Sequence, residues 1–459
     1  MLFHSQGFIL IFLPLMLGAY YATARRPRLR EWVLLAGSLV FYSWWDVRFL
    51  PILLAQSTAT WGAVELYRRT QRKGWLTAGI IANFASLAFF KYTAFLVDSF
   101  AALLGLQAPA ISIVLPIGIS FFTFQLACYL VDVTRGEAHS YPWRRVTLFV
   151  SLFPHLIAGP IVRHHQIMPQ LDADPLRPGL AERFAKGFAF FTIGCAKKVF
   201  IADPMARFAD PIFAAAATST PSLVDAWHGA LAFSFQLFLD FSAYSEMAIG
   251  LGLMLGVRFP DNFDMPYRAT DLSAFWRRWH ITLSQLIRDY LYIPLGGSRH
   301  GWGTYMKATL LSMGLCGLWH GAGWTFVAWG LMHGAGLIVC RIWQHKAPAL
   351  PAALGWALTM LFVLVGWVLF RAPDFTTAAH MLMGLAGLGN GFGPSIVPLN
   401  RVLAVALFAS VLVPSTQRLV EGGWLQPVAY QAVGLAILLV ACILAVGQGQ
   451  PTAFIYFQF

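Results

Sequence analysis

Long apolar runs follow one another along this chain from its first residues to its last. A helix needs about 20 residues to cross a bilayer, short runs can be re-entrant, and long runs can hold two helices. The runs cover residues 7–24, 32–45, 49–67, 75–97, 111–131, 145–162, 184–202, 226–256, 306–342, 354–370, 402–413 and 428–446. Lipid requires internal pairing of every backbone polar group, and no period-two alternation indicates a barrel. We therefore predict an all-α polytopic membrane protein with roughly ten to twelve transmembrane helices.

The composition agrees with a chain that lies mostly in lipid. Hydrophobic residues make up 58% and charged residues only 11%, against about 25% charged residues in soluble domains. No long hydrophilic block separates the apolar runs. The sequence thus predicts a single integral-membrane domain over residues 1–459, with the lipid bilayer as partner and no soluble catalytic module.

Basic residues between the runs indicate the orientation of the chain. Arg25, Arg26, Arg28 and Arg30 follow the first run rather than precede it, so we expect this run to be retained and not cleaved as a signal peptide. The positive-inside rule places this cluster in the cytoplasm and the N-terminus in the periplasm. A second basic cluster at residues 68–73, two runs later, agrees. Loops of this kind account for the net charge of +12, so no nucleic-acid partner is expected.

The central interval from Arg258 to Lys307 is the longest one rich in polar, aromatic and basic residues. On a helical wheel, the stretch 275–291 places Trp276 and Trp279 on an apolar arc, and Arg277 and Arg278 on a polar arc. This pattern predicts a continuous interfacial helix, ended by Pro294, Gly296 and Gly297. His280 lies on the shoulder between the arcs. Periodicity leaves open whether this histidine is functional or an incidental part of a membrane anchor.

His320 lies in an otherwise apolar segment, between Trp319 and Gly321. Full charges at the centre of a bilayer cost about 2.5 to 3.5 kcal/mol, so an ionisable residue there is a functional hypothesis by default. A neutral imidazole costs less and is a base. The glycines at 321 and 323 would let a backbone or an acyl chain approach the ring. A structural histidine bonded between helices is the alternative, and this is the interpretation favoured for His333.

Asp240 also lies within an apolar run, six positions before Glu246. Residues six apart do not share a helical face, which argues against an acid/base pair of carboxylates. We expect Asp240 to pair with an arginine or histidine, or to line a polar tunnel. There is no serine-hydrolase elbow, phosphate loop or dinucleotide fingerprint. The five cysteines lie in apolar segments without metal spacing, so neither a metal site nor a bound cofactor is expected.

Several long motifs, in order along nearly the whole chain, resemble the membrane-bound O-acyltransferase (MBOAT) family, and within it the branch that O-acetylates alginate. The motifs are FYSWWD (41–46), LPIGISFFTFQ (115–125), LIAGPI (156–161), DFSAYSEMAIG (240–250), FWRRWHITLS (275–284), RDYLYIPLGG (288–297) and FIYFQF (454–459). Ala243 and Glu246 depart from residues common in this branch. The resemblance implies a ring of transmembrane helices, with short interfacial or re-entrant helices, around a central tunnel. Carried over by motif, His320 is the reactive histidine and His280 a second histidine on the cytoplasmic side.

The resemblance also implies a reaction. The protein would be a membrane-embedded O-acetyltransferase of the bacterial inner membrane. It would take an acetyl group from a cytoplasmic thioester, acetyl-CoA, and pass it across the membrane to O-acetylate an exopolysaccharide such as alginate. A periplasmic acetyltransferase partner would complete the transfer. The residues expected to line the substrate path are Trp276, Trp279, Asp240, Trp319, Arg277 and Arg278.

Two other functions remain open at the level of the sequence. A proton-coupled transporter or flippase for a cell-envelope precursor would use the histidines as proton relays and Asp240 as part of the path. A structural subunit of a polysaccharide export complex would need no reactive histidine. The absence of an internal repeat weakens the transporter hypothesis, because many transporters have duplicated halves.

Overall fold

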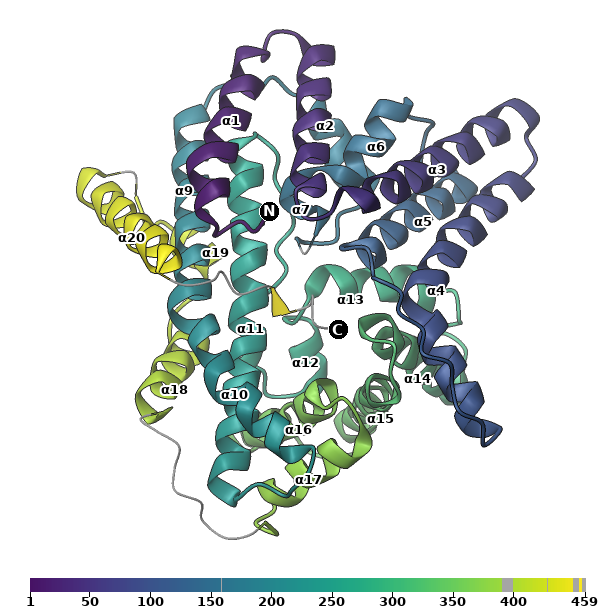
Figure 1. The fold of residues 1–459 in the computed structure, drawn as a ribbon, viewed down its shortest axis with the longest axis vertical. Helices are drawn as coiled ribbons and strands as arrows, with labels where there is room; N and C mark the ends of the chain where they lie inside the picture. Colours follow the sequence, from purple (N-terminus) through teal and green to yellow (C-terminus); the bar gives the residue numbers. More distant parts are fainter. Residues whose placement is uncertain (158, 390–398, 427, 449–453, 456–459) are drawn as a thin grey trace. The chain divides into compact units, whose positions relative to one another are not determined.

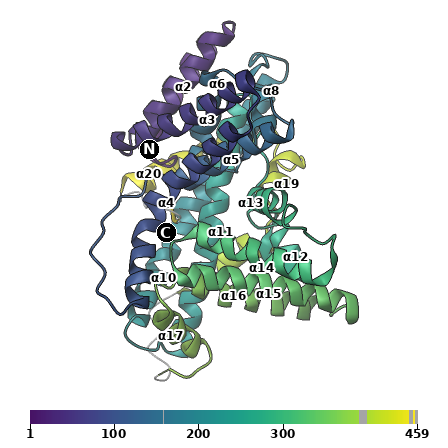
Figure 2. The same ribbon diagram turned by 90° about the vertical axis from the view of Figure 1, so that its right-hand side faces the viewer.

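A computed structural model describes residues 1–157, 159–389, 399–426, 428–448 and 454–455 (Figures 1 and 2). The secondary structure of this described part is helical, without β-strands. The all-α prediction is therefore confirmed. Of the FIYFQF motif, Tyr456 to Phe459 lie outside the described residues, and so does Ala158 of the LIAGPI motif.

The chain divides into two compact units. Unit 1 comprises residues 1–195, 244–260 and 425–453, and unit 2 comprises residues 196–243, 261–424 and 454–459. Both units contain long apolar helices. The single membrane domain expected from the sequence stays a prediction.

Unit 1 is built from helices that pack mainly on their neighbours in sequence. Its elements are η1 (Phe8–Phe12), α1 (Leu13–Ala22), α2 (Pro27–Ser43), η2 (Val47–Phe49), α3 (Leu50–Thr70), α4 (Gly74–Leu103), α5 (Ile119–Arg135), α6 (Trp143–Ser151), α7 (Phe153–Leu156), α8 (His164–Leu171), α9 (Leu180–Lys197) and α20 (Ala429–Gly447). The helices α3, α4 and α5 pack side by side, as Figure 1 shows. A cluster of phenylalanine rings, including Phe8, Phe41 and Phe153, forms part of its core.

Unit 2 holds the central polar interval and the helices that follow it. Its elements are η3 (Lys198–Ala202), α10 (Asp203–Ala216), most of α11 (Leu223–Met254), η4 (Pro266–Arg268), α12 (Leu272–Trp276), α13 (Ile281–Ile287), η5 (Arg288–Tyr292), α14 (Gly301–His320), α15 (Trp324–Lys346), α16 (Ala352–Arg371), α17 (Phe375–Leu385), α18 (Leu399–Leu407), η6 (Phe408–Leu412) and α19 (Thr416–Glu421). The helix α15 packs between α14 and α16 (Figure 1). The predicted run 306–342 is thus two helices.

Five described helices are long and apolar enough to cross a membrane: α4, α11, α15, α16 and α20. The most apolar part of α11 is entirely buried, whereas α4 and α20 expose most of theirs. An apolar helix that is buried all round belongs to a protein core, and one exposed over most of its surface suits contact with lipid. Two shorter apolar helices cover Phe8–Ala22 and Leu403–Leu412. The membrane character is confirmed, while the count of ten to twelve spans is not.

Two predicted spans are wrong in their boundaries. Residues 145–162 were expected as one span, but α6 ends at Ser151 and only the short α7 follows it. Pro154 contributes to this break, because proline cannot donate a helical hydrogen bond. In the run 111–131 the helix begins only at Ile119, after Gly118 in the left-handed conformation with φ of 74°. In both runs a proline or a glycine interrupts the helix although the surrounding residues are apolar.

Close backbone contact joins α14 and α15. A Cβ atom on Gly317 would lie 2.1 Å from the carbonyl oxygen of Phe326, and one on Gly330 would lie 2.1 Å from that of Met313. Only glycine allows two helices to approach so closely. These glycines therefore determine the spacing of the helix pair that carries His320.

We expect Gly317→Ala to lower the free energy of unfolding by about 1 to 3 kcal/mol, because the added methyl group must push the two backbones apart. The measurement is the thermal unfolding midpoint of the purified protein in detergent. Gly303→Ala is the matched control in the same helix, since a Cβ at that position meets nothing within 4 Å. Equal midpoints for the two variants would contradict this account of the helix pair.

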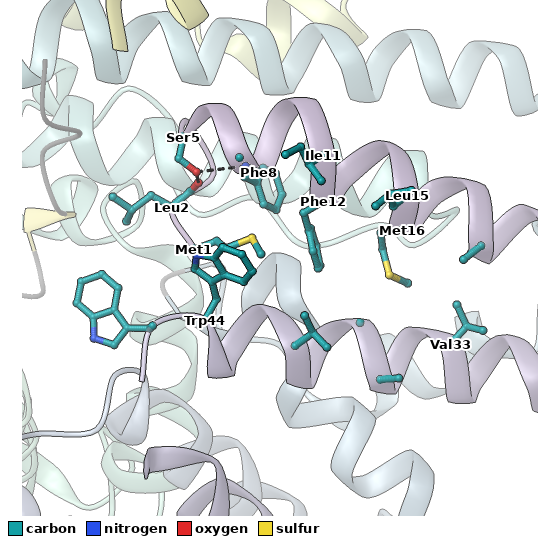
Figure 3. Close-up of a pocket in the computed structure, with 16 residues that line it drawn as sticks. Met1, Leu2, Ser5, Phe8, Ile11, Phe12, Leu15, Met16, Val33 and Trp44 are labelled. Carbon is teal, nitrogen blue, oxygen red and sulfur yellow. Dashed lines mark hydrogen bonds between the residues drawn. The ribbon is translucent and has the colours of Figure 1, made fainter. Parts of the chain in front are cut away.

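An apolar groove of about 790 Å³ lies within unit 1, between η1–α1 and α2. Figure 3 shows Phe8, Phe12 and Met16 pointing into the space opposite Val33 and Trp44. Its lining includes Ser5 but no residue with a titratable side chain. The groove therefore offers apolar surface and no side chain for proton transfer.

Candidate active site

His280 marks a break in the backbone rather than a position on a helix. The predicted helix over 275–291 is wrong: α12 ends at Trp276, α13 begins at Ile281, and the π-helical turn η5 follows. His280 itself has a φ of 41°. This left-handed conformation is uncommon for residues other than glycine, and it persists only where the surrounding structure imposes it.

The side chain and backbone of Asn262 impose this break. Its carbonyl oxygen Oδ1 accepts from the hydroxyl of Thr282 at 2.8 Å and lies 3.0 Å from Nδ1 of His280. Its backbone carbonyl accepts the N–H of Ile281 at 2.9 Å. These bonds satisfy polar groups that a continuous helix would have paired internally. The helical wheel could not predict the break at His280, because its cause, Asn262, lies 18 residues upstream.

The same contact determines the tautomer of His280. An amide oxygen cannot donate, so Nδ1 of His280 must carry the proton and donate it to Asn262. The lone pair is then on Nε2, which has no hydrogen-bond partner among the described residues. Burial lowers the pKa of His280 to about 3, so the ring is neutral at physiological pH. His280 therefore presents an imidazole nitrogen able to accept a hydrogen bond.

His320 is the last residue of α14 and is almost fully buried. Its ring lies among the rings of Trp319, Trp329 and Phe370, with centroid distances of 4.9, 5.2 and 5.3 Å. Gly321 leaves room for the ring of Phe326, which packs on Phe370, because a Cβ on Gly321 would lie 2.1 Å from that ring. Gly321, which we expected to let a backbone or an acyl chain approach His320, therefore accommodates an aromatic side chain instead.

Trp319 brings the two predicted histidines into one site. Its ring centroid is 4.9 Å from that of His320 and 6.3 Å from that of His280. Phe241 and Phe263 contact the His280 ring from other sides. Two buried imidazoles and a shared indole form a site that excludes bulk water, in which a general base could act on a bound hydroxyl.

The predicted residues Trp276 and Trp279 are buried in the aromatic wall of this site. The indole N–H of Trp276 donates to Nδ1 of His333 at 3.2 Å, and Trp279 packs on Trp367 with ring centroids 4.8 Å apart. His333 thus bonds between α15 and α12, which agrees with the structural role favoured for it from the sequence. Trp329 and His333 are four residues apart on α15 and so share a helical face.

The two arginines of the motif lie away from the aromatic wall. Arg277 is exposed, and Arg278 is half-buried with its guanidinium 3.5 Å from the backbone carbonyl of Asp264. Within the described part of the chain, neither guanidinium contacts His280 or His320. Their expected role in lining the substrate path stays a prediction.

Asp240 has a different partner from the one expected. Its Oδ1 lies 2.9 Å from Nζ of Lys198, a lysine rather than an arginine or histidine. Both side chains are almost completely buried. The partner lies 42 residues earlier in the chain, at the junction of α9 and η3, so helical periodicity could not identify it.

A cavity of about 200 Å³ within unit 2 is lined in part by Trp276. Its wall includes hydroxyl groups and one cationic side chain, from Ser284, Tyr305, Ser312 and Arg288. Oγ of Ser312 has no hydrogen-bond partner among the described residues. The cavity thus combines apolar walls with polar groups able to orient a ligand.

In unit 1, Asp132, His164 and His165 could hold a metal ion. Their donor atoms lie within 4.8 Å of one another, and Nε2 of His164 is 3.1 Å from Oδ2 of Asp132. Asp132 and His164 are buried, whereas His165 is exposed. The sequence suggested no metal site because the carboxylate lies about 30 residues before the histidines.

We expect Asn262→Ala to lower acyl transfer by roughly 10- to 100-fold, because misplacing a group by about 1 Å can cost two orders of magnitude. The variant loses the acceptor that fixes the tautomer of His280 and the bond to Thr282. Asn262→Asp is the matched rescue, since a carboxylate still accepts both bonds. Wild-type turnover by Asn262→Ala, at equal expression and thermal stability, would remove Asn262 from the site.

Comparison with known proteins shows the family of the chain. The sequence profile of the membrane-bound O-acyltransferase family (MBOAT) matches residues 39–372. The "Probable alginate O-acetylase AlgI" of Azotobacter vinelandii is 42% identical over 405 residues, which are 85% of this chain and 79% of that protein. The "Peptidoglycan O-acetyltransferase" of Helicobacter pylori is 38% identical over 87% of this chain and 82% of its own length. The "Teichoic acid D-alanyltransferase" of Bacillus subtilis is 26% identical over 67% of this chain and 81% of its own length. The chain therefore belongs to the membrane-bound O-acyltransferase family and is an O-acyltransferase.

Proposed function

We propose that this protein takes an acetyl group from cytoplasmic acetyl-CoA and passes it across the membrane for O-acetylation of an exopolysaccharide such as alginate. The observation that carries the proposal is the buried site in which Trp319 contacts both His280 and His320. The names of the relatives support acetyl as the acyl group and a polymer of the cell envelope as its destination. A periplasmic acetyltransferase partner completes the transfer to the polymer.

In the proposed reaction, His320 acts as general base on the hydroxyl of the acceptor. The hydroxyl oxygen forms a bond to the thioester carbonyl carbon, the carbon–sulfur bond breaks, and the proton taken by His320 passes to the leaving thiolate. His320 ends a helix, and the negative end of a helix dipole stabilises the imidazolium formed on the way. His280 positions the donor through Nε2, and the indole walls exclude the water that would hydrolyse the thioester.

The cavity beside Trp276 suits the pantetheine arm of the donor. That arm carries amide groups that need hydrogen-bond partners, and Ser284, Tyr305 and Ser312 offer hydroxyls along the cavity wall. The stretch 288–307 adds Arg299 and Lys307, while Arg288 is paired with Asp289. Their positive charge favours the phosphates of a nucleotide-bearing thioester.

We further infer a multi-pass protein of the bacterial inner membrane. Its N-terminus is periplasmic, with the basic clusters at 25–30 and 68–73 in the cytoplasm. In this proposal roughly ten to twelve helices form a ring around a central tunnel. Asp240 is neutralised by Lys198, and this pairing gives no support to the alternative in which Asp240 belongs to the proton path of a transporter.

Membranes containing the protein, its periplasmic partner and a glycan acceptor should convert labelled acetyl-CoA to free CoA and acetylated glycan. Long-chain acyl-CoA serves as the donor control, and membranes without the protein give the background hydrolysis. Acetylation that requires the protein would support the proposal. Glycan or precursor movement across the membrane without thioester consumption would replace it with the transporter function.

A further inference from the structure

The segment Phe454–Ile455 is buried within unit 2. Both side chains have only 1% of their surface exposed. The backbone N–H of Ile455 donates to Oδ2 of Asp240 at 2.9 Å. This segment is more than 200 residues from Asp240 in the sequence, so its attachment depends on tertiary contacts rather than on local structure.

The acceptor of this hydrogen bond belongs to a buried ion pair. Nζ of Lys198 lies 2.9 Å from the other oxygen of Asp240, and 2.7 Å from Oδ1 of Asp203. Burying a charge is costly unless it is paired and hydrogen-bonded. Lys198 balances the charge of Asp240, and a hydrogen bond from an amide to a carboxylate of an ion pair is charge-assisted and stronger than a neutral one.

One aromatic ring links this segment to the candidate active site. Phe241 follows Asp240 on α11, and its ring contacts Phe454 at a centroid distance of 5.5 Å. The same ring contacts His280 edge-on at 4.7 Å. His280 holds a left-handed backbone conformation, so its position depends on the groups packed around it.

We propose that Lys198, Asp240 and the Phe454–Ile455 segment form a positioning network for His280. The ion pair anchors the amide of Ile455, Phe454 supports Phe241, and Phe241 holds the imidazole in place. These are positioning residues, because none of them has to touch the reacting groups. The inference deepens the proposed function, since it presumes that His280 serves acyl transfer.

Ile455→Pro tests the network directly, because proline has no N–H to donate to Asp240. Ile455→Val is the matched control that keeps the N–H and changes little volume. We expect Ile455→Pro to lower kcat by roughly 10- to 100-fold with the KM for acetyl-CoA unchanged, and Ile455→Val to stay near wild type. Hydrogen–deuterium exchange should rise in the peptide that contains His280 in the proline variant only.

Phe454→Leu provides a second variant if Ile455→Pro fails to fold. It keeps the amide of Ile455 but removes the ring that supports Phe241, so exchange around His280 should rise and kcat should fall. Equal kcat and equal exchange for Ile455→Pro and Ile455→Val would overturn the network. If the wild-type protein transfers no acetyl group, the proposed function fails, while the exchange measurement still tests the network.

Discussion

His320→Ala should lower acyl transfer from acetyl-CoA by between about 100- and 10,000-fold, the range typical for loss of a general base. The imidazole is the titratable group enclosed by Trp319, Trp329 and Phe370, and alanine leaves the acceptor hydroxyl without a base. The measurement is the transfer of labelled acetyl groups by membranes with matched amounts of each variant. Because these walls would remain in place, we expect acetyl-CoA binding to be largely retained.

The matched control is His345→Ala, which removes an exposed histidine of the same unit. Its ring contacts the backbone carbonyl of Arg341 and the ring of Trp302, and among the described residues it contacts neither candidate histidine. We expect this variant to transfer acetyl groups at the wild-type rate. Equal activity in His320→Ala and His345→Ala would exclude His320 as the base and would direct attention to His280.

The sequence identified the long apolar helices well because their signal is local. The predicted runs 354–370 and 428–446 agree closely with α16 (Ala352–Arg371) and α20 (Ala429–Gly447). Apolarity over about 20 residues is a property of the segment itself in lipid. Where the prediction was wrong, as for residues 145–162, a single proline or glycine changed the backbone path without changing the apolarity.

The candidate site was only partly predictable for a different reason. His320 is conspicuous in sequence because an ionisable group in an apolar segment needs an explanation, and its proximity to Trp319 follows from adjacency. The break at His280 depends on Asn262, and the charge of Asp240 is balanced by Lys198. Both causes are tertiary contacts between separate elements, and a helical wheel contains no information about them.

Lys198→Met should lower the free energy of unfolding by about 3 to 5 kcal/mol, the cost of leaving one partner of a buried ion pair without the other. Asp240 is 1% exposed, so solvent cannot replace the lost lysine. Asp203, the second partner, has 21% of its side chain exposed, and water can solvate part of its charge. The measurement is unfolding of the purified protein in detergent, followed by tryptophan fluorescence.

The double variant Lys198→Met/Asp240→Asn separates charge from shape. Asparagine keeps a side-chain oxygen for the amide of Ile455 but carries no charge that needs a partner. We expect it to recover most of the stability lost in Lys198→Met, because replacing both members of a buried pair is often nearly neutral. Asp203→Asn should lower the free energy of unfolding less than Lys198→Met does, since Lys198 keeps Asp240 as its partner. If the double variant is as unstable as Lys198→Met, the loss comes from the packing of the lysine stem, and the charge of Asp240 is not what holds this part of unit 2 together.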